Sequence, residues 1–279
     1  MSFDTLVSVG DLAAHLTDPG WIVFDCRHDL VDTESGRRTY SQLHIPGARF
    51  LHLDDDLSGP KTGANGRHPL PDPTRFCARL AALGMANGKQ VVGYDASGGC
   101  YAARLWWMLR WVGHDRVAVL DGGWNAWHQA GLPVTAQLPV ITPGAFNGNA
   151  QDQTVDANFI LNELGQSRSR VIDARSPDRF HGENETLDPV GGHIPGALNR
   201  FFKDNLAADG RFRPAAELKQ EFSALLDALP PTQAVHQCGS GVTACHNLLA
   251  MEIAGLHGAK LYPGSWSEWC SDPQRPIAR

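Results

Sequence analysis

The chain repeats itself. Four landmarks occur in the same order in its two halves, separated by 142 to 149 residues. They are an apolar run ending in Asp-x-Arg (Asp25, Asp173), a His-Ile-Pro-Gly-Ala segment (His44, His193), a second apolar run (ending at Asp95, Cys238) and a Gly-Trp segment (Trp124, Trp266). Because self-similarity at a near-constant separation indicates duplication, the sequence predicts two domains of one fold.

Each half alternates apolar runs with helix-like stretches. We expect strands at 21–27, 90–95, 170–175 and 232–238, and helices at 74–84, 215–229 and 246–255. A third short strand in each half is expected to run into the Gly-Trp segment, within 117–127 and 259–269. Such alternation predicts an α/β fold in which each domain is a parallel sheet flanked by helices on both faces. Residues 138–152 are rich in Pro, Gly and Asn. We therefore expect domains at 1–138 and 154–279, joined by a linker at 139–153.

Charge and cysteine usage narrow the class of protein. The net charge of −6 argues against nucleic acid or an anionic membrane surface as the main partner. No apolar run reaches 18 residues, and the first residues do not resemble a signal peptide, so we expect no membrane span. The six cysteines are scattered without a Cys-x-x-Cys pair, which favours reduced thiols and a cytoplasmic location.

Cys238 stands where an expected strand meets an expected helix. The turn after it contains Gly239 and Gly241, and glycine costs stability unless the backbone needs its freedom. Unpaired N–H groups at the start of a helix can hold an anion, and a cysteine facing them is stabilised as the thiolate. A buried core cysteine is the alternative. In the first half Asp95 takes the place of Cys238, so we expect a non-catalytic first domain with Asp95 as a turn residue.

Two other groups of residues are expected to be structural. His236, Cys238, Cys245 and His246 are close in sequence, but the first two alternate along a strand and the last two diverge on a helix. We therefore expect no metal site and no cofactor. The pairs at the strand ends are expected to be structural ion pairs: Asp25 with Arg27, and Asp173 with Arg175.

A thiolate in such a cradle fits three chemistries. Acyl transfer needs a histidine base; His236 would face away, whereas His68 or His193 could approach in space. Phosphate-ester hydrolysis of the Cys-x5-Arg type needs an arginine where this chain has Ala244, so it is disfavoured. Sulfur transfer through a persulfide needs only a small anion cradle, which the short uncharged loop at 239–243 suits best.

The chain resembles the tandem-domain rhodaneses over nearly its whole length. Cys-Gly-Ser-Gly-Val-Thr-Ala at 238–244 is similar to the active-site loop of the family's 3-mercaptopyruvate sulfurtransferases, whereas its thiosulfate sulfurtransferases carry basic residues there. The resemblance implies two rhodanese-like domains packed face to face with the site between them. It implies transfer of sulfur from 3-mercaptopyruvate to a cysteine persulfide, release of pyruvate, and discharge to a thiol such as thioredoxin or to cyanide.

The same resemblance assigns roles to single residues. Cys238 matches the nucleophile, and Ser240 the serine that passes a proton to the departing enolate. His68 would partner Ser240, and Asp54 would stand behind that histidine, with Asp55 or Asp56 as alternatives. Substrate contacts would come from Arg179, which matches the arginine that holds the substrate carboxylate, and from the loop residues Gly239, Gly241, Val242 and Thr243.

One expected feature is missing. The family's mercaptopyruvate enzymes carry a second substrate arginine shortly before the second His-Ile-Pro-Gly, but residues 183–192 contain no Arg or Lys. Arg200, Arg37 or Arg38 could compensate. Two alternatives therefore stay open: a thiosulfate:cyanide sulfurtransferase, and a non-catalytic rhodanese-type module for sulfur carriage or protein interaction.

Overall fold

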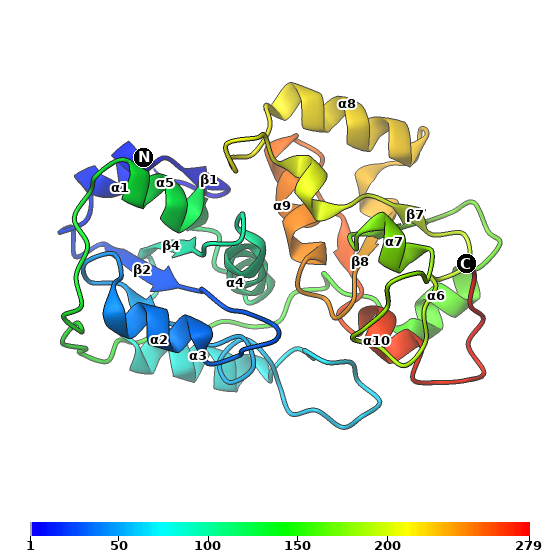
Figure 1. Ribbon diagram of the computed structural model, residues 1–279, viewed down its shortest axis with the longest axis horizontal. Helices are drawn as coiled ribbons and strands as arrows, with labels where there is room; N and C mark the ends of the chain where they lie inside the picture. The colour runs from blue at the N-terminus through cyan, green and yellow to red at the C-terminus, as the bar shows by residue number, and fades with distance from the viewer. Residues whose placement is uncertain (1) are drawn as a thin grey trace. The chain divides into compact units, whose positions relative to one another are not determined.

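The computed structural model describes residues 2–279, which fall into two compact units (Figure 1). Unit 1 comprises Met1–Gly59, Pro71–Asp152 and Ala208–Arg211, and unit 2 comprises Pro60–Leu70, Gln153–Ala207 and Phe212–Arg279. Residues 60–70 of the first half thus belong to unit 2. Residues 139–150 of the expected linker belong to unit 1 and form neither helix nor strand there.

Unit 1 is built on a five-stranded parallel sheet of order β1-β5-β4-β2-β3. Its elements in chain order are β1 (Leu6–Val7), α1 (Val9–Ala14), β2 (Trp21–Asp25), α2 (Ser35–Gln42), β3 (Arg49–Phe50), α3 (Pro73–Ala82), β4 (Gln90–Tyr94), α4 (Cys100–Trp111), β5 (Val117–Leu120) and α5 (Gly123–Gln129).

Both faces of this sheet are covered. Side chains alternate between the faces of a strand. On β4, Val92 and Tyr94 pack with α1 and with Trp127 of α5. Gly93 between them faces α4, because a side chain there would come within 3.5 Å of the Cβ of Ala102. Figure 1 shows α1 and α5 on one side of β2, and α2 and α3 on the other.

Unit 2 repeats the plan with a four-stranded parallel sheet of order β7-β6-β8-β9. Its elements are α6 (Ala157–Glu163), β6 (Arg170–Asp173), α7 (Pro177–Phe180), β7 (Leu198–Asn199), η1 (Phe202–Asn205), α8 (Ala215–Leu226), η2 (Pro231–Gln233), β8 (Ala234–Gln237), α9 (Ala244–Ile253), β9 (Lys260–Leu261) and α10 (Ser265–Trp269).

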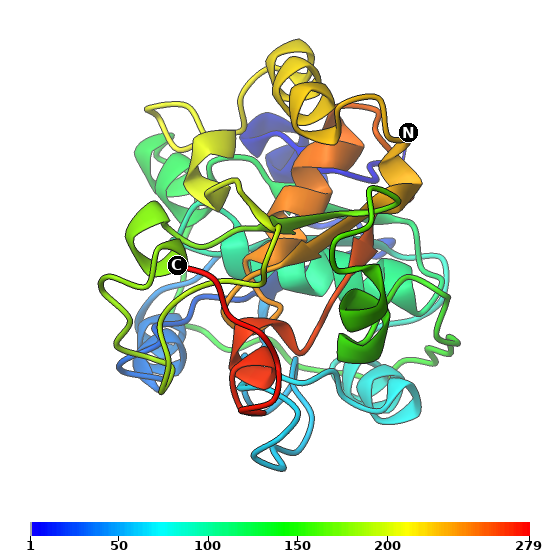
Figure 2. The same ribbon diagram turned by 90° about the vertical axis from the view of Figure 1, so that its right-hand side faces the viewer.

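Alternation along β8 again separates two apolar layers. Val235 packs with Ile160 of α6 and Trp266 of α10, whereas Ala234 packs with Phe222 of α8 and with α9. Figure 2 shows α8 and α9 on one side of the sheet and α10 on the other. The predicted α/β fold, with parallel sheets flanked by helices on both faces, is therefore confirmed in each unit.

The Asp-x-Arg landmarks form ion pairs at the ends of their strands, as expected. The Nη2 of Arg27 lies 2.6 Å from the Oδ2 of Asp25, and that of Arg175 lies 2.7 Å from the Oδ2 of Asp173, with all four side chains buried. Each guanidinium also stacks over the tryptophan of its own Gly-Trp segment, 4.4 and 4.8 Å from the ring centroid. The prediction of structural ion pairs is confirmed.

No helix within residues 2–279 combines the length and the apolar character that crossing a lipid bilayer requires.

Candidate active site

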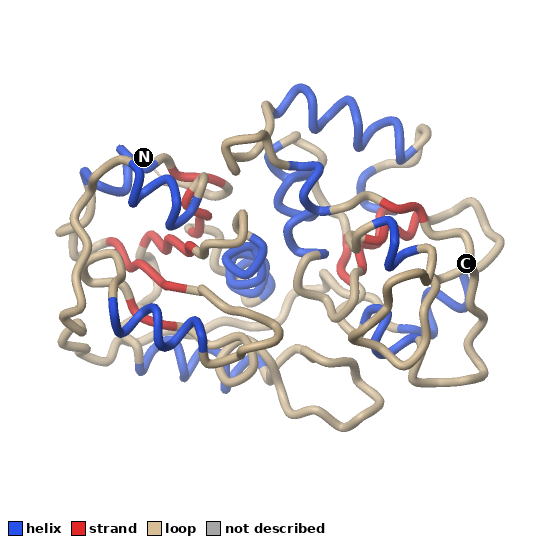
Figure 3. Tube along the Cα trace, viewed as in Figure 1, coloured by secondary structure: helices blue, strands red, loops and turns tan. Residues whose placement is uncertain are grey.

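Cys238 lies one residue past the carboxyl end of β8, at the entrance to the loop that leads into α9. Figure 3 draws this connection between the strand and the helix in tan. In a parallel α/β sheet this is the edge at which ligands bind. Hydrogen bonds to the first residues of α10 hold the start of the loop in place. The backbone N–H of Cys238 donates to the Oγ of Ser265 (3.1 Å), and the N–H of Trp266 donates to the carbonyl of Cys238 (3.0 Å).

Gly241 gives the loop its turn. Its φ is +76°, and a Cβ at this position would sit 2.4 Å from the carbonyl oxygen of Pro263. Both the left-handed backbone and the close approach of a second chain segment require glycine. The loop is therefore rigidly placed against the segment that precedes α10.

Ser240 and His68 form the hydrogen bond that the resemblance implied. The Oγ of Ser240 lies 2.7 Å from the Nδ1 of His68, and both side chains are buried. His68 comes from the 60–70 segment that belongs to unit 2, so the pair is internal to that unit. A hydroxyl in contact with an imidazole can relay a proton to or from a reacting group.

Two guanidinium groups converge on the residue after Cys238. A Cβ built on Gly239 would lie 2.8 Å from the Nη2 of Arg67, and 3.5 and 3.6 Å from Nη2 and Nη1 of Arg179. The loop itself carries no charge, but these side chains bring two positive charges to its surface. Planar guanidinium groups are suited to holding a carboxylate.

Two acids hold these arginines. Arg179 donates through Nη2 to both carboxylate oxygens of Glu185 (2.9 Å) and lies 3.4 Å from Asp188, which also pairs with Arg67. Burial works to raise the pKa of Glu185, but N–H donation from Leu187 and from Arg179 outweighs it and holds the pKa below its usual value. Burial raises the pKa of Asp188, against the pull of both arginines. The arginines are thus oriented before any ligand binds.

The three arginines named as substitutes for the missing one are engaged in other ion pairs. Arg200 pairs with Glu221 at 2.6 Å and lies over the ring of Phe222, away from the loop. Arg37 and Arg38 form ion pairs with acids of unit 1 and are exposed. Arg67 is the basic residue that lies nearest to Gly239. Its position directly before His68 was the available signal, because the segment that delivers the histidine also delivers its neighbour.

The other histidines near the loop are structural. His236 is fully buried on β8, and burial lowers its pKa to about 3, so it is neutral and cannot serve as a base at neutral pH. Its Nε2 faces the sulfur of Met251 at 2.9 Å, so the imidazole is directed at α9. The expectation that strand alternation would turn it away from Cys238 was wrong, because residues two apart in a strand share a face. His193 stacks on Phe180 with the ring centroids 3.8 Å apart, and its Nδ1 contacts the carbonyl of the same residue.

Asp95, at the place equivalent to Cys238 in unit 1, is more than a turn residue. Its buried carboxylate accepts four backbone hydrogen bonds of 2.7 to 2.9 Å from the loop that follows β4 and from the start of α4. Burial raises the pKa of Asp95, and these four donors work against that rise. The loop that follows β4 is therefore an anion cradle that already contains its own anion.

The equivalent loop of unit 2 presents two of these donors without such an anion. Ser97 and Gly99, two of the four donors to Asp95, correspond to Ser240 and Val242 at the repeat separation of 143 residues. Within residues 2–279, the N–H groups of Ser240, Val242 and Thr243 donate to no acceptor. Thr243 directly precedes α9, where the helix dipole adds to the attraction for an anion.

The three acids considered for a place behind His68 differ in their engagement. All belong to the segment after β3 in unit 1. Asp56 pairs with Arg79 at 2.6 Å and accepts from the N–H of His52, and Asp55 pairs with Arg37 at 3.1 Å. Asp54 is half-buried, and its place behind His68 stays a prediction.

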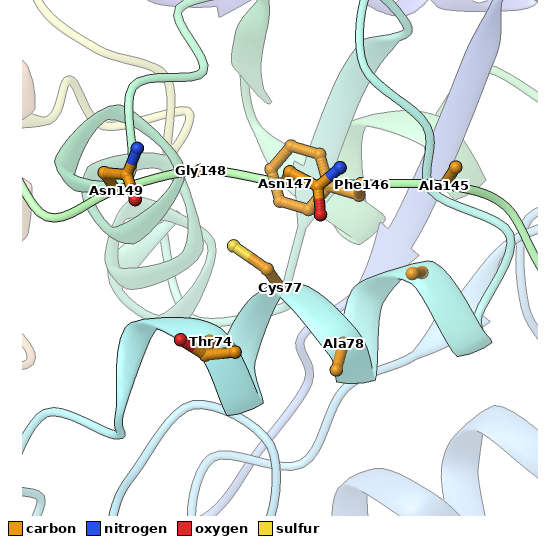
Figure 4. Close-up of a pocket in the computed structure, with 9 residues that line it drawn as sticks. Thr74, Cys77, Ala78, Ala145, Phe146, Asn147, Gly148 and Asn149 are labelled. Atoms are coloured by element: carbon orange, nitrogen blue, oxygen red, sulfur yellow. The ribbon is translucent and has the colours of Figure 1, made fainter.

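A separate pocket of about 520 Å³ lies in unit 1 between α3 and residues 145–149 (Figure 4). Cys77 projects from α3 toward Phe146 and Gly148 in this pocket. Burial raises the pKa of the Cys77 thiol, and no basic side chain lines the pocket. Cys77 therefore lacks the surroundings that activate a cysteine.

Comparisons with known proteins agree with this geometry. A family model described as a rhodanese-like domain matches residues 8–130 and 156–272. A probable 3-mercaptopyruvate sulfurtransferase of Pseudomonas aeruginosa is 49% identical over 281 residues, covering 100% of this chain and 99% of that protein. Thiosulfate sulfurtransferase of Gallus gallus is 35% identical, covering 90% of this chain and 86% of that protein.

Solved structures agree as well. The 3-mercaptopyruvate sulfurtransferase of Leishmania major matches with a TM-score of 0.86 and 31% identity, over 98% of this chain and 76% of that one. The family match extends over both units, and the cysteine loop at the end of β8 lies within the second matched region. This chain belongs to the rhodanese family, of which it carries two domains in tandem.

Proposed function

We propose that this chain is a sulfurtransferase that takes sulfur from 3-mercaptopyruvate onto Cys238 and passes it to a thiol acceptor or to cyanide. The observation that carries the proposal is the 2.7 Å contact between His68 and Ser240. Ser240 lies two residues after the cysteine. A carbon leaving group departs as an enolate that must be protonated, whereas sulfite departing from thiosulfate needs no proton. A built proton relay therefore favours the carbon-bound donor.

The reaction follows from the groups present. The Cys238 thiolate attacks the donor sulfur and forms the S–S bond, while the C–S bond breaks and its electron pair moves onto the carbon as the enolate of pyruvate. The Ser240 hydroxyl delivers a proton to that carbon and regains one from His68. The products are pyruvate and a Cys238 persulfide, whose outer sulfur an acceptor nucleophile removes in a second attack.

The carboxylate of the donor has a matching site. Arg67 and Arg179 flank Gly239, and together they would orient the 2-oxo acid so that its sulfur faces Cys238. The N–H groups of Ser240, Val242 and Thr243 would hold the charge that develops on the reacting atoms. We also propose that Asp54 supports His68, and that a cytoplasmic thiol protein such as thioredoxin is the acceptor.

One observation favours a second donor. Two guanidinium groups beside an anion cradle also suit the dianion thiosulfate, and the 35% identical avian relative bears the name thiosulfate sulfurtransferase. Thiosulfate:cyanide sulfur transfer is therefore the alternative function of this same site.

Mass spectrometry of the intact chain after incubation with each donor tests the proposal. We expect 3-mercaptopyruvate to add the mass of one sulfur to the wild type and to the Cys77→Ser control, but not to Cys238→Ser. Steady-state rates with both donors then set the preference. More efficient turnover of thiosulfate would reassign the donor, and no sulfur loading by either compound would leave a non-catalytic rhodanese module.

A further inference from the structure

Three potential metal ligands meet at one edge of the unit 1 sheet. Of the three, only Asp54 has a role in the proposed sulfur transfer. His28 follows β2, and His52 and Asp54 follow β3. These strands are parallel neighbours, with Asp25 beside Phe50, so the residues that follow them meet at the same sheet edge. One ligand atom from each residue lies within 4.8 Å of the other two.

His28 is the unexplained member of this cluster. Its side chain is buried, the residue being 8% exposed, yet neither ring nitrogen has a hydrogen-bond partner. The ring meets that of His52 edge to face, with the centroids 5.2 Å apart and the planes 82° apart. A buried polar group without a partner costs about 1–3 kcal/mol. The arrangement is accounted for if a ligand supplies the missing partner.

His52 is oriented as a metal-binding histidine would be. Its Nε2 lies 2.9 Å from the carbonyl of Thr33, which makes Nε2 the N–H donor and leaves the lone pair on Nδ1. The Nδ1 lone pair accepts two long hydrogen bonds from the N–H groups of Asp54 and Asp55, at 3.2 and 3.3 Å, which a metal ion would replace. Histidine ligands commonly donate their other N–H to a backbone carbonyl in this way.

The charges around the cluster favour a cation. Glu34 lies 3.5 Å from the Nε2 of His52, and Asp55 lies 3.6 Å from its Nδ1. One cation, Arg37, pairs with both of these acids at 3.1 Å. Counting Asp54, three carboxylates face one guanidinium there, so the local balance is negative.

We propose that His28, His52 and Asp54 bind a divalent first-row transition ion, with Zn²⁺ as the preferred ion. Two imidazoles and one carboxylate are a donor set that Zn²⁺ accepts, with bonds of about 2.0–2.2 Å and a fourth position left for water. The sequence did not suggest this site, because the first two ligands lie 24 positions apart. If Asp54 supports His68 as proposed, the bound ion would compete for that carboxylate and slow sulfur transfer.

Co²⁺ titration of the reduced, metal-free full-length chain tests the site, because d–d absorption reports coordination and charge-transfer bands reveal thiolate ligands. We expect one equivalent of Co²⁺ to bind without a thiolate band and to be displaced by Zn²⁺, which binds more tightly to such ligands. His28→Phe, which keeps an aromatic ring against Tyr101, should weaken Co²⁺ binding by about tenfold or more, and Asp54→Asn should also weaken it.

Two controls separate this site from other binders. His257 is an exposed histidine paired with Glu252, so His257→Phe removes a surface site and should leave the titration unchanged. Cys238→Ser removes the reactive thiol and should also leave the Co²⁺ titration unchanged. Equal affinity in the wild type and His28→Phe, or loss of the signal in either control, would overturn the proposal. Because the readout is binding, it is independent of whether the chain transfers sulfur.

Discussion

Arg67 is the residue that the sequence did not assign to the site, and removing its guanidinium tests its contribution to substrate binding. Arg67→Ala takes away the group that lies nearest to Gly239, while Arg179 remains on the other side of the loop. A hydrogen bond to a charged partner contributes about 1.5–3 kcal/mol. At 1.4 kcal/mol per factor of ten, KM for 3-mercaptopyruvate should therefore rise about 10- to 150-fold.

The substitution also removes the partner of Asp188, whose side chain is 2% exposed. An unpaired buried acid costs stability and would draw Arg179, now 3.4 Å away, toward itself. The double variant Arg67→Ala/Asp188→Asn removes both charges and should keep the raised KM while regaining the stability. Gly239→Ala offers a third approach, since its Cβ would push the Arg67 guanidinium aside without meeting backbone atoms.

Steady-state kinetics with 3-mercaptopyruvate at saturating acceptor measures the effect. The matched control is Arg168→Ala, an exposed arginine of unit 2 that pairs with Glu163 and should leave KM unchanged. Arg179→Ala should likewise raise KM more than it lowers kcat, because both arginines hold the carboxylate in the ground state and the transition state alike. A KM within about twofold of the wild type for Arg67→Ala and for the double variant would refute the carboxylate site.

Three further outcomes are expected. Ser240→Ala, which leaves His68 without its 2.7 Å partner, should lower kcat for 3-mercaptopyruvate by about 10²–10⁴-fold and affect thiosulfate much less, as rapid-mixing kinetics would show. Gly241→Ala should destabilise the fold by about 2 kcal/mol or more in urea unfolding, because it combines φ of +76° with a clash against Pro263. His236 has its pKa lowered to about 3, so the folded state resists the proton that the unfolded state gains below about 6.5. Stability should fall as pH falls through this window, by about 2 kcal/mol at pH 5, and His236→Leu should remove that part of the loss; identical pH profiles would contradict it.

Local pattern was sufficient to predict most of the fold. The apolar runs that became β2, β4, β5, β6, β8 and β9 were recognisable because parallel strands buried on both faces leave little room for polar residues. The Ser240–His68 contact was also anticipated, but only through resemblance. Residues 172 positions apart carry no local signal of their proximity.

What could not be predicted depends on side-chain direction and on how the chain crosses between units. Arg67 belongs to the first half by sequence, yet residues 60–70 pack with unit 2 and bring its guanidinium to Gly239. Glu185 and Asp188 lie in the interval that was searched for an arginine, and they turned out to be the acids that hold two arginines. A search for a basic residue in this interval could not reveal that the interval supplies acidic residues instead.

The two loops together explain why a duplicated fold has one reactive centre. Backbone N–H groups beyond the end of the equivalent strand form a cradle in both units, since the turn into the following helix leaves them without helical partners. In unit 1 the Asp95 carboxylate fills that cradle with four hydrogen bonds, so no external anion has donors left to bind. In unit 2 the shorter thiol of Cys238 leaves the N–H groups of Ser240 and Val242 without acceptors. The same backbone is thus a structural support in one repeat and an anion-binding loop in the other, and the side chain at a single position decides between them.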